Sequence, residues 1–311
     1  MSTRILFLTG GLGNQLFQYS AFNAYAAKSK LVIDLVNGNP RVNGSEIPEL
    51  LDFELTNGIE FHTRRMPLIT RKAIGYSLRS HLNPVGVEKS VFWRWTSRLC
   101  TSVLASIHYR KVLIVQVLSD LGDDPKFRVN RGNSLFLGYF QSIRWAKSLE
   151  MTLRIREQVT SDLVQRYREL SETELPLIVH VRLGDYVSEG GFGIPSQDYY
   201  AEALKEMLGT GKYKKIWLFS DEPSRALELL APHLNFEHRI INEPGASSAE
   251  TLEIMRFGSG YIIGNSTFSW WGAFTSHSES PRVKYPYPWF KDVNPPKNLT
   301  PEGWEPLNAR F

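Results

Sequence analysis

The sequence RILFLTGGLGNQLFQYSAFNAYAAKSKLVID occupies residues 4–34 and determines how the N-terminal part of the chain folds. The apolar runs at residues 4–9 and 31–34 are typical of buried strands. Between them, the glycine turn GGLGNQ at residues 10–15 precedes a helical pattern over residues 16–30. A strand, a glycine turn, a helix and a second strand in this order predict a βαβ unit with parallel strands.

The second half of the chain alternates between short apolar runs and helical patterns. The runs predict strands at residues 177–182, 215–220, 239–241 and 261–263, and the patterns predict helices at residues 197–208, 224–230, 250–256 and 268–276. Ser196 is the predicted N-cap of the first of these helices. Such alternation predicts the α/β class, with a parallel sheet covered on both faces and ligands at the carboxyl ends of its strands.

Length and composition limit the classes of protein to consider. The chain has 311 residues, 42% hydrophobic and 22% charged, so two domains with packed cores are feasible. The single cysteine, Cys100, excludes an intrachain disulfide and a zinc site made of several cysteines, and it favours a reducing compartment. No stretch approaches the roughly 18 apolar residues of a membrane span. We expect a cytoplasmic protein, with contact to a membrane surface as the alternative.

The first polar cluster is HVRLGDY at residues 180–186, at the end of a predicted strand. His180 and Arg182 are two residues apart, so their side chains point to the same side of the strand. A guanidinium at a strand end can bind a diphosphate through a bidentate fork. The alternative is an arginine–aspartate ion pair that closes the loop.

A second cluster, FSDEP at residues 219–223, also follows a predicted strand. The carboxylate of Asp221 or Glu222 could accept hydrogen bonds from a guanine ring. The alternative is a helix N-terminus, where acidic side chains complement the helix dipole.

The third cluster, GNSTFSWWG at residues 264–272, follows a strand and opens a helix. Its backbone N–H groups and the hydroxyls of Ser266, Thr267 and Ser269 offer an anion site, and plain N-capping is the alternative. Trp270 and its neighbour either stack on a sugar or base, or pack in the core. The N-terminal glycine turn is neither a dinucleotide fingerprint nor a phosphate loop, so by itself it indicates only a ligand-facing turn.

Together and in this order, these segments resemble the α-1,2-fucosyltransferases of glycosyltransferase family 11. The matching strings are GGLGNQLFQYSA at residues 10–21, GYFQS at 138–142, HVRLGDY at 180–186, FSDE at 219–222 and NSTFSWWGA at 265–273. The strings extend over most of the chain. The first and the last are specific, whereas FSDE alone would be weak.

The resemblance implies a GT-B type α/β fold, in which two facing Rossmann-like domains each contain a parallel sheet. We expect an acceptor-side domain over residues 1–165 and a GDP-fucose-binding domain over residues 166–311. Separately, the helical spacing and the charge pairs four residues apart at residues 145–170 predict a helix that links the two halves. The implied reaction is inverting transfer of L-fucose from GDP-β-L-fucose to the 2-hydroxyl of a β-galactoside, as in the biosynthesis of O-antigen polysaccharide.

The resemblance also assigns roles to residues. It places His180 and Arg182 on the donor, with Arg182 on the diphosphate, and Asp221 or Glu222 on the guanine or ribose. The remaining donor-binding residues are Asn265, Ser266, Thr267 and Ser269. The residues expected to line the cleft on the acceptor side are Gly11, Asn14, Gln15, Tyr186 and Trp270. Two positions depart from the family pattern, because Leu183 replaces a second arginine and Glu222 a second aspartate that many members carry.

A general base should take the proton from the acceptor hydroxyl. Asp185 is the first candidate and Glu189 the second, because both follow the donor-binding arginine. The alternative for Asp185 is that it orients Arg182 or Tyr186. No Asp-X-Asp triplet occurs in the sequence, so we expect no metal on the diphosphate and no cofactor, with GDP-fucose as a substrate.

The segment at residues 61–119 holds ten Lys or Arg residues and one acid, Glu88. Together with Phe92, Trp93 and Trp95, its charges could dock on an anionic membrane and meet a lipid-linked glycan. A helix is expected over residues 91–107. The alternative is a solvated basic face with ordinary core aromatics.

Rival functions remain at this point. They are fucose transfer with another linkage, use of another GDP-sugar, and glycan binding without catalysis. A nucleic-acid binder is suggested only by the net charge of +4, and no recognition motif accompanies that charge.

Overall fold

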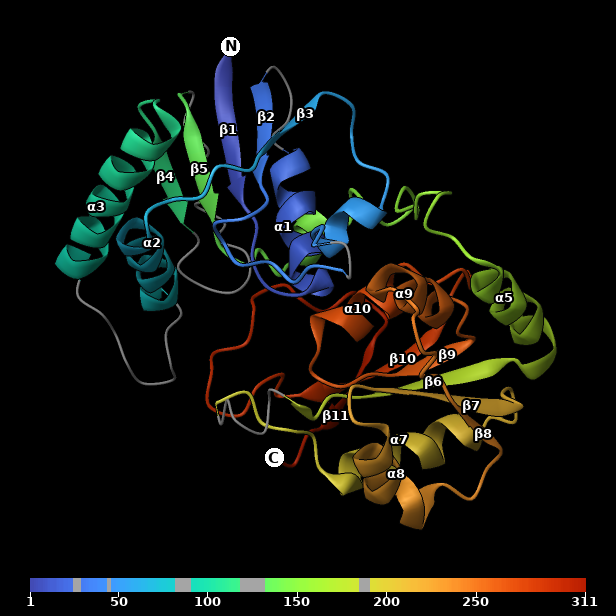
Figure 1. Cartoon of the computed structure of the whole chain (residues 1–311). Helices are drawn as coiled ribbons and strands as arrows, with labels where there is room; N and C mark the ends of the chain where they lie inside the picture. The colour runs from blue at the N-terminus through green and yellow to red at the C-terminus, as the bar shows by residue number, and fades with distance from the viewer. Residues whose placement is uncertain (25–28, 44–45, 82–90, 118–131, 185–190) are drawn as a thin grey trace. The chain divides into compact units, whose positions relative to one another are not determined.

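The computed structural model describes residues 1–24, 29–43, 46–81, 91–117, 132–184 and 191–311. These residues form two compact units (Figure 1). Unit 1 consists of Met1–Arg154 and Pro296–Leu299, and unit 2 of Ile155–Pro295 and Thr300–Phe311. The division falls earlier than the expected boundary at residue 165, because Ser161, which precedes α5 (Asp162–Glu174), donates its hydroxyl to the Glu250 carboxylate inside unit 2.

Unit 1 is built on a parallel sheet with the described strand order β3-β2-β1-β5-β4. Its strands are β1 (Ser2–Phe7), β2 (Ser29–Asp34), β3 (Ile59–His62), β4 (Ile114–Val117) and β5 (Ser134–Leu137). Its helices are α1 (Leu12–Ala24), α2 (Leu68–His81), α3 (Val91–Tyr109) and the short α4 (Ile143–Ala146), with a 3₁₀ turn η1 (Glu49–Asp52). Figure 1 shows α1 on one face of the sheet and the pair α2 and α3 on the other.

Alternation along the strands decides which face each helix covers. In β5, Leu135 and Leu137 contribute to the core beneath α2 and α3, while the Phe136 ring lies 5.7 Å from Phe22 of α1. Successive strand side chains point to opposite faces, so both faces of this sheet are apolar and covered.

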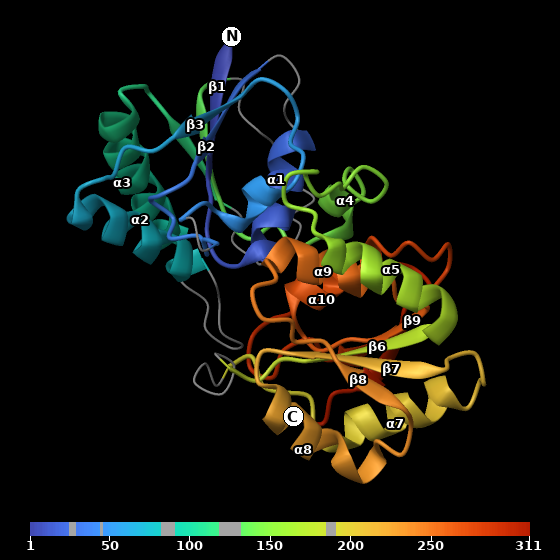
Figure 2. The same cartoon turned by 45° about the vertical axis from the view of Figure 1, so that its right-hand side comes forward.

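Unit 2 is built on a second parallel sheet with the described order β11-β10-β9-β6-β7-β8. Its strands are β6 (Pro176–Val181), β7 (Lys215–Ser220), β8 (His238–Ile240), β9 (Gly260–Ile262), β10 (Arg282–Tyr287) and β11 (Glu305–Asn308). Its helices, besides α5, are α7 (Gln197–Leu208), α8 (Pro223–Leu230), α9 (Ser248–Arg256) and α10 (Thr267–Phe274), with a 3₁₀ turn η2 (Ala231–His233). Figure 2 shows α9 and α10 on one face of this sheet and α7 and α8 on the other.

Counted from β6, the strand order of unit 2 is that of a doubly wound dinucleotide-binding sheet, 3-2-1-4-5-6. The predicted α/β class, with a parallel sheet in each of two Rossmann-like units, is confirmed. Within the described residues, no helix is long and apolar enough to cross a membrane.

The predicted alternation in the second half is confirmed, and most element ends agree within two residues. Ser196 caps α7 as expected, because its Oγ accepts from the Tyr199 backbone N–H at 3.4 Å. The prediction of a single linking helix over residues 145–170 is wrong. Helix α4 ends at Ala146, and a new helix begins only after Ser161, whose extended backbone breaks the helical path. Charge pairs four residues apart support a helix but do not enforce one.

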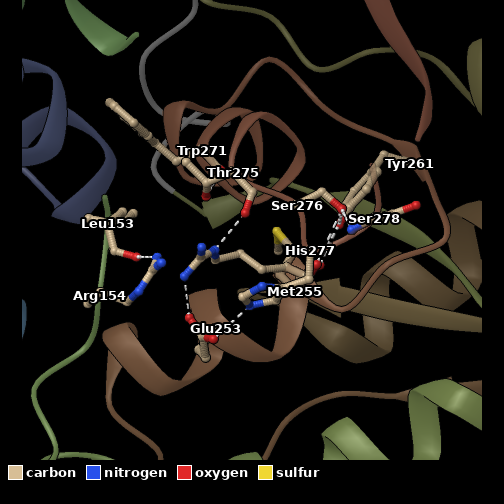
Figure 3. A network of polar contacts seen from close by, with 11 residues as sticks. Leu153, Arg154, Glu253, Met255, Tyr261, Trp271, Thr275, Ser276, His277 and Ser278 are labelled. Carbon is tan, nitrogen blue, oxygen red and sulfur yellow. Dashed lines mark hydrogen bonds and ion pairs between the residues drawn. The ribbon is translucent and has the colours of Figure 1, made fainter. Parts of the chain in front are cut away.

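A buried polar network joins the ends of α9 and α10 (Figure 3). Arg256 donates from Nε to the Thr275 carbonyl at 2.7 Å and from Nη1 to the Glu253 carboxylate at 2.5 Å. His277 Nε2 lies 2.8 Å from the other oxygen of Glu253. Burial acts to raise the pKa of Glu253, but His277 and Arg256 outweigh it and hold the pKa below its ordinary value. Glu253 is therefore an ionised carboxylate inside the fold.

The two helices also approach closely at Gly272 of α10. A Cβ at this position would lie 2.5 Å from Sδ and 2.7 Å from Cγ of Met255 on α9. The spacing of α9 and α10 therefore depends on a glycine here. Together with the network, this contact fixes α10 and sets the position of its N-terminus at the carboxyl end of β9.

We expect Arg256→Met to lower the free energy of unfolding by about 3–5 kcal/mol, because Glu253 would stay buried without its guanidinium partner. The double variant Arg256→Met/Glu253→Gln removes both charges and should recover much of this loss. Urea unfolding followed by circular dichroism measures both. A single variant as stable as the wild type would contradict the assignment.

Candidate functional site

The candidate site of unit 2 lies where β6 and β9 run side by side. These strands are neighbours in the sheet, but the chain leaves β6 towards β7 and leaves β9 towards β10, on opposite sides. In doubly wound sheets, ligands bind outside the carboxyl ends of the strands at such a switch point. The first and third predicted clusters follow these two strands, so the fold brings them together.

Arg182 and Asp221 form an ion pair at the ends of β6 and β7. Val181 is opposite Ser220 in the parallel ladder, so the next residue of each strand comes to the same level. Arg182 Nη1 lies 3.2 Å from Asp221 Oδ2, and the side chains are 18% and 23% exposed. The ion pair anticipated as the alternative for this cluster is thus present, with Asp221 as the partner of Arg182.

The Asp221 carboxylate also holds the turn that follows β6. Its Oδ1 accepts from the Leu183 N–H and its Oδ2 from the Gly184 N–H, each at 3.0 Å. A Cβ at position 184 would lie 2.5 Å from Asp221 Oδ2, so the turn requires glycine. Asp221 is therefore a positioning residue for Arg182. Its predicted contact with guanine or ribose stays a prediction.

Glu222 lies next to Asp221 but has a different set of partners. Its carboxylate pairs with Arg225 at 2.6 Å, and its backbone N–H donates to Ser220 Oγ at 3.0 Å. Glu222 is also the N-cap residue of α8, although its side chain makes no capping bond. This matches the helix N-terminus alternative, and a role in reading the nucleotide remains a prediction.

His180 is buried beside α10, with its ring centroid 6.4 Å from that of Phe268. Burial, reinforced by the nearby Arg182 cation, lowers the pKa of His180 to about 3. The imidazole is therefore neutral at physiological pH. Its Nδ1 is buried without a hydrogen-bond partner among the described residues. In contact with a ligand, such a residue would supply a hydrogen bond and not a charge.

The turn from β9 to α10 packs against β6. A Cβ on Gly264 would lie 3.3 Å from the His180 carbonyl oxygen and 3.2 Å from the Tyr200 hydroxyl. Ser266 is the N-cap of α10, and its Oγ accepts from the Phe268 N–H at 3.3 Å. Thr267 follows at the first helical position and is partly exposed. The N-terminus of α10 thus lies at the switch point beside His180.

Three residues assigned to binding surfaces are buried structural residues. Ser269 is fully buried and donates from its hydroxyl to the Ser266 carbonyl at 3.2 Å, inside the helix turn. Trp270 is also fully buried, and its ring stacks on Phe274 at 4.6 Å. Asn265 is 1% exposed and donates from Nδ2 to two carbonyls of the loop at Phe192 and Gly193. In this structure the side chains of Ser269 and Trp270 are closed off from solvent, which does not match the donor contact and the cleft lining expected of them. The expected role of Asn265 in donor binding stays a prediction.

Three predicted residues lie outside the described residues. They are the two candidate bases, Asp185 and Glu189, and the predicted cleft residue Tyr186. The loop held by Asn265 begins directly after them. Asn265 thus connects the start of α10 to the described residues Phe192 and Gly193.

In unit 1, the glycine turn between β1 and α1 is held by buried hydrogen bonds. Gln15 is fully buried, donates to the Gly10 and Arg41 carbonyls, and accepts from the Leu50 N–H at 2.9 Å. It supports the turn from beneath, so its assignment as a cleft residue is wrong. Gly11 and Asn14 are partly exposed, as a lining role requires. The N-terminus of α1 is capped by Glu49, which accepts from the Leu12 N–H at 2.8 Å.

Gln141 is a residue of this turn region that the sequence did not reveal. Its Nε2 donates to Asn14 Oδ1 at 3.0 Å, which links the carboxyl ends of the neighbouring strands β1 and β5. The preceding backbone is unusual, with a φ of +55° at the buried Phe140. Gln141 Oε1 is buried without a hydrogen-bond partner among the described residues. The string GYFQS carried the signal, but only as part of the family resemblance.

In the part of the chain that the structure describes, His, Cys, Asp and Glu side chains form no group of three or more that could hold a metal ion.

Comparisons with known proteins give a family and two relatives. Residues 120–288, more than half of the chain, match Glycosyl transferase family 11. The chain is 28% identical to the O-antigen biosynthesis glycosyltransferase WbnK of Escherichia coli, over 96% of its own length and 98% of that protein. It is 24% identical to an alpha-1,2-colitosyltransferase of Escherichia coli, over 94% and 93% of the two chains. The crystal structure of the fucosyltransferase NodZ from Bradyrhizobium matches with a TM-score of 0.48 and 14% identity, over 87% of this chain and 91% of that one.

The neutral state of His180 should show in the pH dependence of stability. The unfolded chain takes up a proton at this residue as the pH falls below 6.5, whereas the folded chain does so only near its pKa of about 3. The stability that depends on neutral His180 is therefore fully present above pH 6.5 and is lost as the pH decreases below it. From pH 7 to pH 5, His180 should cost about 2 kcal/mol of unfolding free energy.

Urea unfolding of wild type and His180→Asn at both pH values measures this effect. The variant should lose about 2 kcal/mol less than the wild type over the same pH interval, whatever its absolute stability. Other titrating groups are common to both proteins and cancel in the difference. Equal pH dependence of the two would show that His180 is not held neutral.

Proposed function

Because the chain belongs to Glycosyl transferase family 11, we propose that it is an inverting α-1,2-fucosyltransferase that transfers L-fucose from GDP-β-L-fucose to the 2-hydroxyl of a β-galactoside in a glycan. The observation that carries the proposal is the position of Arg182. Its guanidinium stands at the switch point of a doubly wound sheet and is oriented by Asp221. A cation held there suits the diphosphate of a nucleotide sugar.

Inversion requires one displacement at the anomeric carbon. The acceptor oxygen forms its bond to this carbon as the bond to the β-phosphate oxygen breaks, and negative charge grows on the departing GDP. Donors aimed at that charge provide the largest share of such catalysis. In the proposed mechanism, Arg182 supplies a fixed cation and the start of α10 supplies backbone N–H groups at Ser266 and Thr267.

His180 has a separate role in this proposal. Because its imidazole is neutral and its Nδ1 is buried without a partner among the described residues, it can give a hydrogen bond to the donor. It adds no charge beside Arg182. The proposed site therefore holds the diphosphate with one cation, one neutral imidazole and one helix N-terminus.

The acceptor hydroxyl must lose its proton during the transfer. We assign this step to Asp185, with Glu189 as the second candidate, since both follow Arg182 closely in sequence. The variants Asp185→Asn and Glu189→Gln distinguish them, because loss of the base lowers transfer while GDP binding is retained.

The proposal includes transfer without a metal ion or cofactor. Arg182 and the α10 N-terminus would balance the diphosphate charge that a divalent cation balances in other transferases. GDP-fucose is then a substrate, and the reaction needs only the two substrates and the protein.

The two Escherichia coli relatives support the glycan context and the linkage. One is named for O-antigen biosynthesis, which supports a galactose-terminated unit of a surface polysaccharide, free or lipid-linked, as the acceptor. The other is named an alpha-1,2-colitosyltransferase, which supports the α-1,2 linkage. That name also favours a second candidate donor, GDP-colitose, whose sugar lacks the 3-hydroxyl of L-fucose.

The decisive experiment is a donor and acceptor panel. Purified protein is incubated with GDP-fucose, GDP-colitose or GDP-mannose and with lacto-N-biose, N-acetyllactosamine or a simple β-galactoside. We expect acceptor-dependent GDP release with GDP-fucose, unchanged by EDTA, and an α-1,2-linked product by NMR. Preference for GDP-colitose would select the second donor. No GDP release with any pair would favour a glycan-binding protein, and another linkage would overturn the regiochemistry.

A further inference from the structure

The outward face of α3 carries a continuous stripe of exposed apolar side chains. Its members follow one another at spacings of three or four residues, which places them on one face of the helix. They are Phe92 (72% exposed), Trp95 (60%), Leu99 (50%), Val103 (51%) and Ile107 (71%). The alternative that the aromatic residues of this segment belong to the core is wrong for Phe92 and Trp95, while the side chain of Trp93 lies outside the described residues.

The opposite face of α3 is already used inside unit 1. Thr101, Ala105 and His108 are buried against the sheet side of the helix. The C-terminal end is tied down, because the Tyr109 hydroxyl donates to the Asp34 carboxylate and His108 lies 2.9 Å from His62. Helix α3 is thus buried on one face and exposes apolar side chains on the opposite face, and packing within the unit accounts only for the buried face.

Helix α2 also exposes apolar side chains. Figures 1 and 2 both show α2 beside α3 on the same side of the unit 1 sheet. Ile69 is 82% exposed and Tyr76 is 60% exposed, and they lie two helical turns apart with the exposed Lys72 between them. Contiguous exposed apolar side chains of this kind mark an interaction surface, whereas single ones do not.

The charges around this surface have one sign. Residues 61–119 contain ten Lys or Arg residues and a single acid. Those described as exposed are Arg64, Arg65, Lys72, Arg98, Arg110 and Lys111. A partner for this surface must therefore be apolar within and anionic at its edge.

We propose that the faces of α2 and α3 defined by these residues dock on an anionic lipid surface. The stripe of α3 would lie in the plane of the membrane and enter the boundary between headgroups and acyl chains. The exposed Lys and Arg side chains would contact lipid phosphates. Amphipathic helices with aromatic and aliphatic residues on one side and basic residues beside them bind anionic bilayers in this way.

A second copy of the chain fits this surface less well. Most homodimers use the same patch on both subunits, so pairing through α3 would bring Lys72, Arg98 and Lys111 of one copy towards those of the other. The surface offers almost no acids to offset that repulsion. An anionic bilayer supplies both the apolar layer and the opposite charge.

Vesicle flotation tests the proposal with the full chain. Vesicles of pure phosphatidylcholine are compared with vesicles of equal parts phosphatidylcholine and phosphatidylglycerol. We expect binding to the anionic vesicles only, and weaker binding as salt is raised. Trp95→Ser/Ile107→Ser should weaken the affinity at least about tenfold, because it removes two apolar anchors, whereas Met151→Ser, at an exposed residue outside the surface, should not.

A matched pair of charge reversals tests the electrostatic part. Lys72→Glu/Lys111→Glu should weaken binding at least about tenfold. Lys212→Glu/Lys214→Glu changes the net charge equally at exposed positions of unit 2 and should have little effect. Circular dichroism confirms that each variant is folded. Transfer to a soluble acceptor without vesicles is measured in parallel, so failure of the membrane proposal and failure of the proposed function are distinguished.

Three outcomes would overturn the proposal. They are no binding of the wild type to anionic vesicles, equal weakening by both charge reversals, and a wild-type dimer in sedimentation that Trp95→Ser/Ile107→Ser converts to monomer.

Discussion

One carboxylate organises the end of the sheet in unit 2. Asp221 accepts from two backbone N–H groups of the turn after β6 and pairs with the guanidinium of Arg182. Hydrogen bonds to an ionised carboxylate are stronger than those between neutral groups, particularly where water is partly excluded. The direction of Arg182 is therefore fixed before any ligand arrives, and Gly184 is the residue that lets the turn come close enough.

The other side of the site is set by packing. The hydrogen bond from Arg256 to the Thr275 carbonyl and the contact between Gly272 and Met255 hold α10 against α9. This places the start of α10 beside His180, although the two are far apart in sequence. One side thus depends on a charged turn and the other on a buried network. The proposed donor site needs both, because neither a lone arginine nor a lone helix N-terminus would define a diphosphate site.

The sequence was informative about elements and chemistry, and less so about exposure. Apolar runs predicted β6 and β7, since parallel strands buried on both faces leave a clear pattern, and the helical pattern between them predicted α7. Residue type could not show that Gln15 and Trp270 face inward. An amide or an indole side chain occurs both in protein cores and in ligand-binding sites, so only the packed structure shows which of the two applies. Likewise, Asp221 could be identified as a carboxylate at a strand end, but its three donors come from a turn whose geometry no local pattern specifies.

Titration calorimetry of GDP with Asp221→Asn and Arg182→Lys tests the central claim most directly. Arg225→Lys serves as the control, because Arg225 pairs with Glu222 and not with Asp221. If Asp221 orients Arg182 for the diphosphate, each variant should bind GDP at least about tenfold more weakly. The double variant should bind GDP only slightly more weakly than the single variant with the lower affinity, because the two residues act as a unit. Wild-type GDP affinity in both single variants would contradict the account.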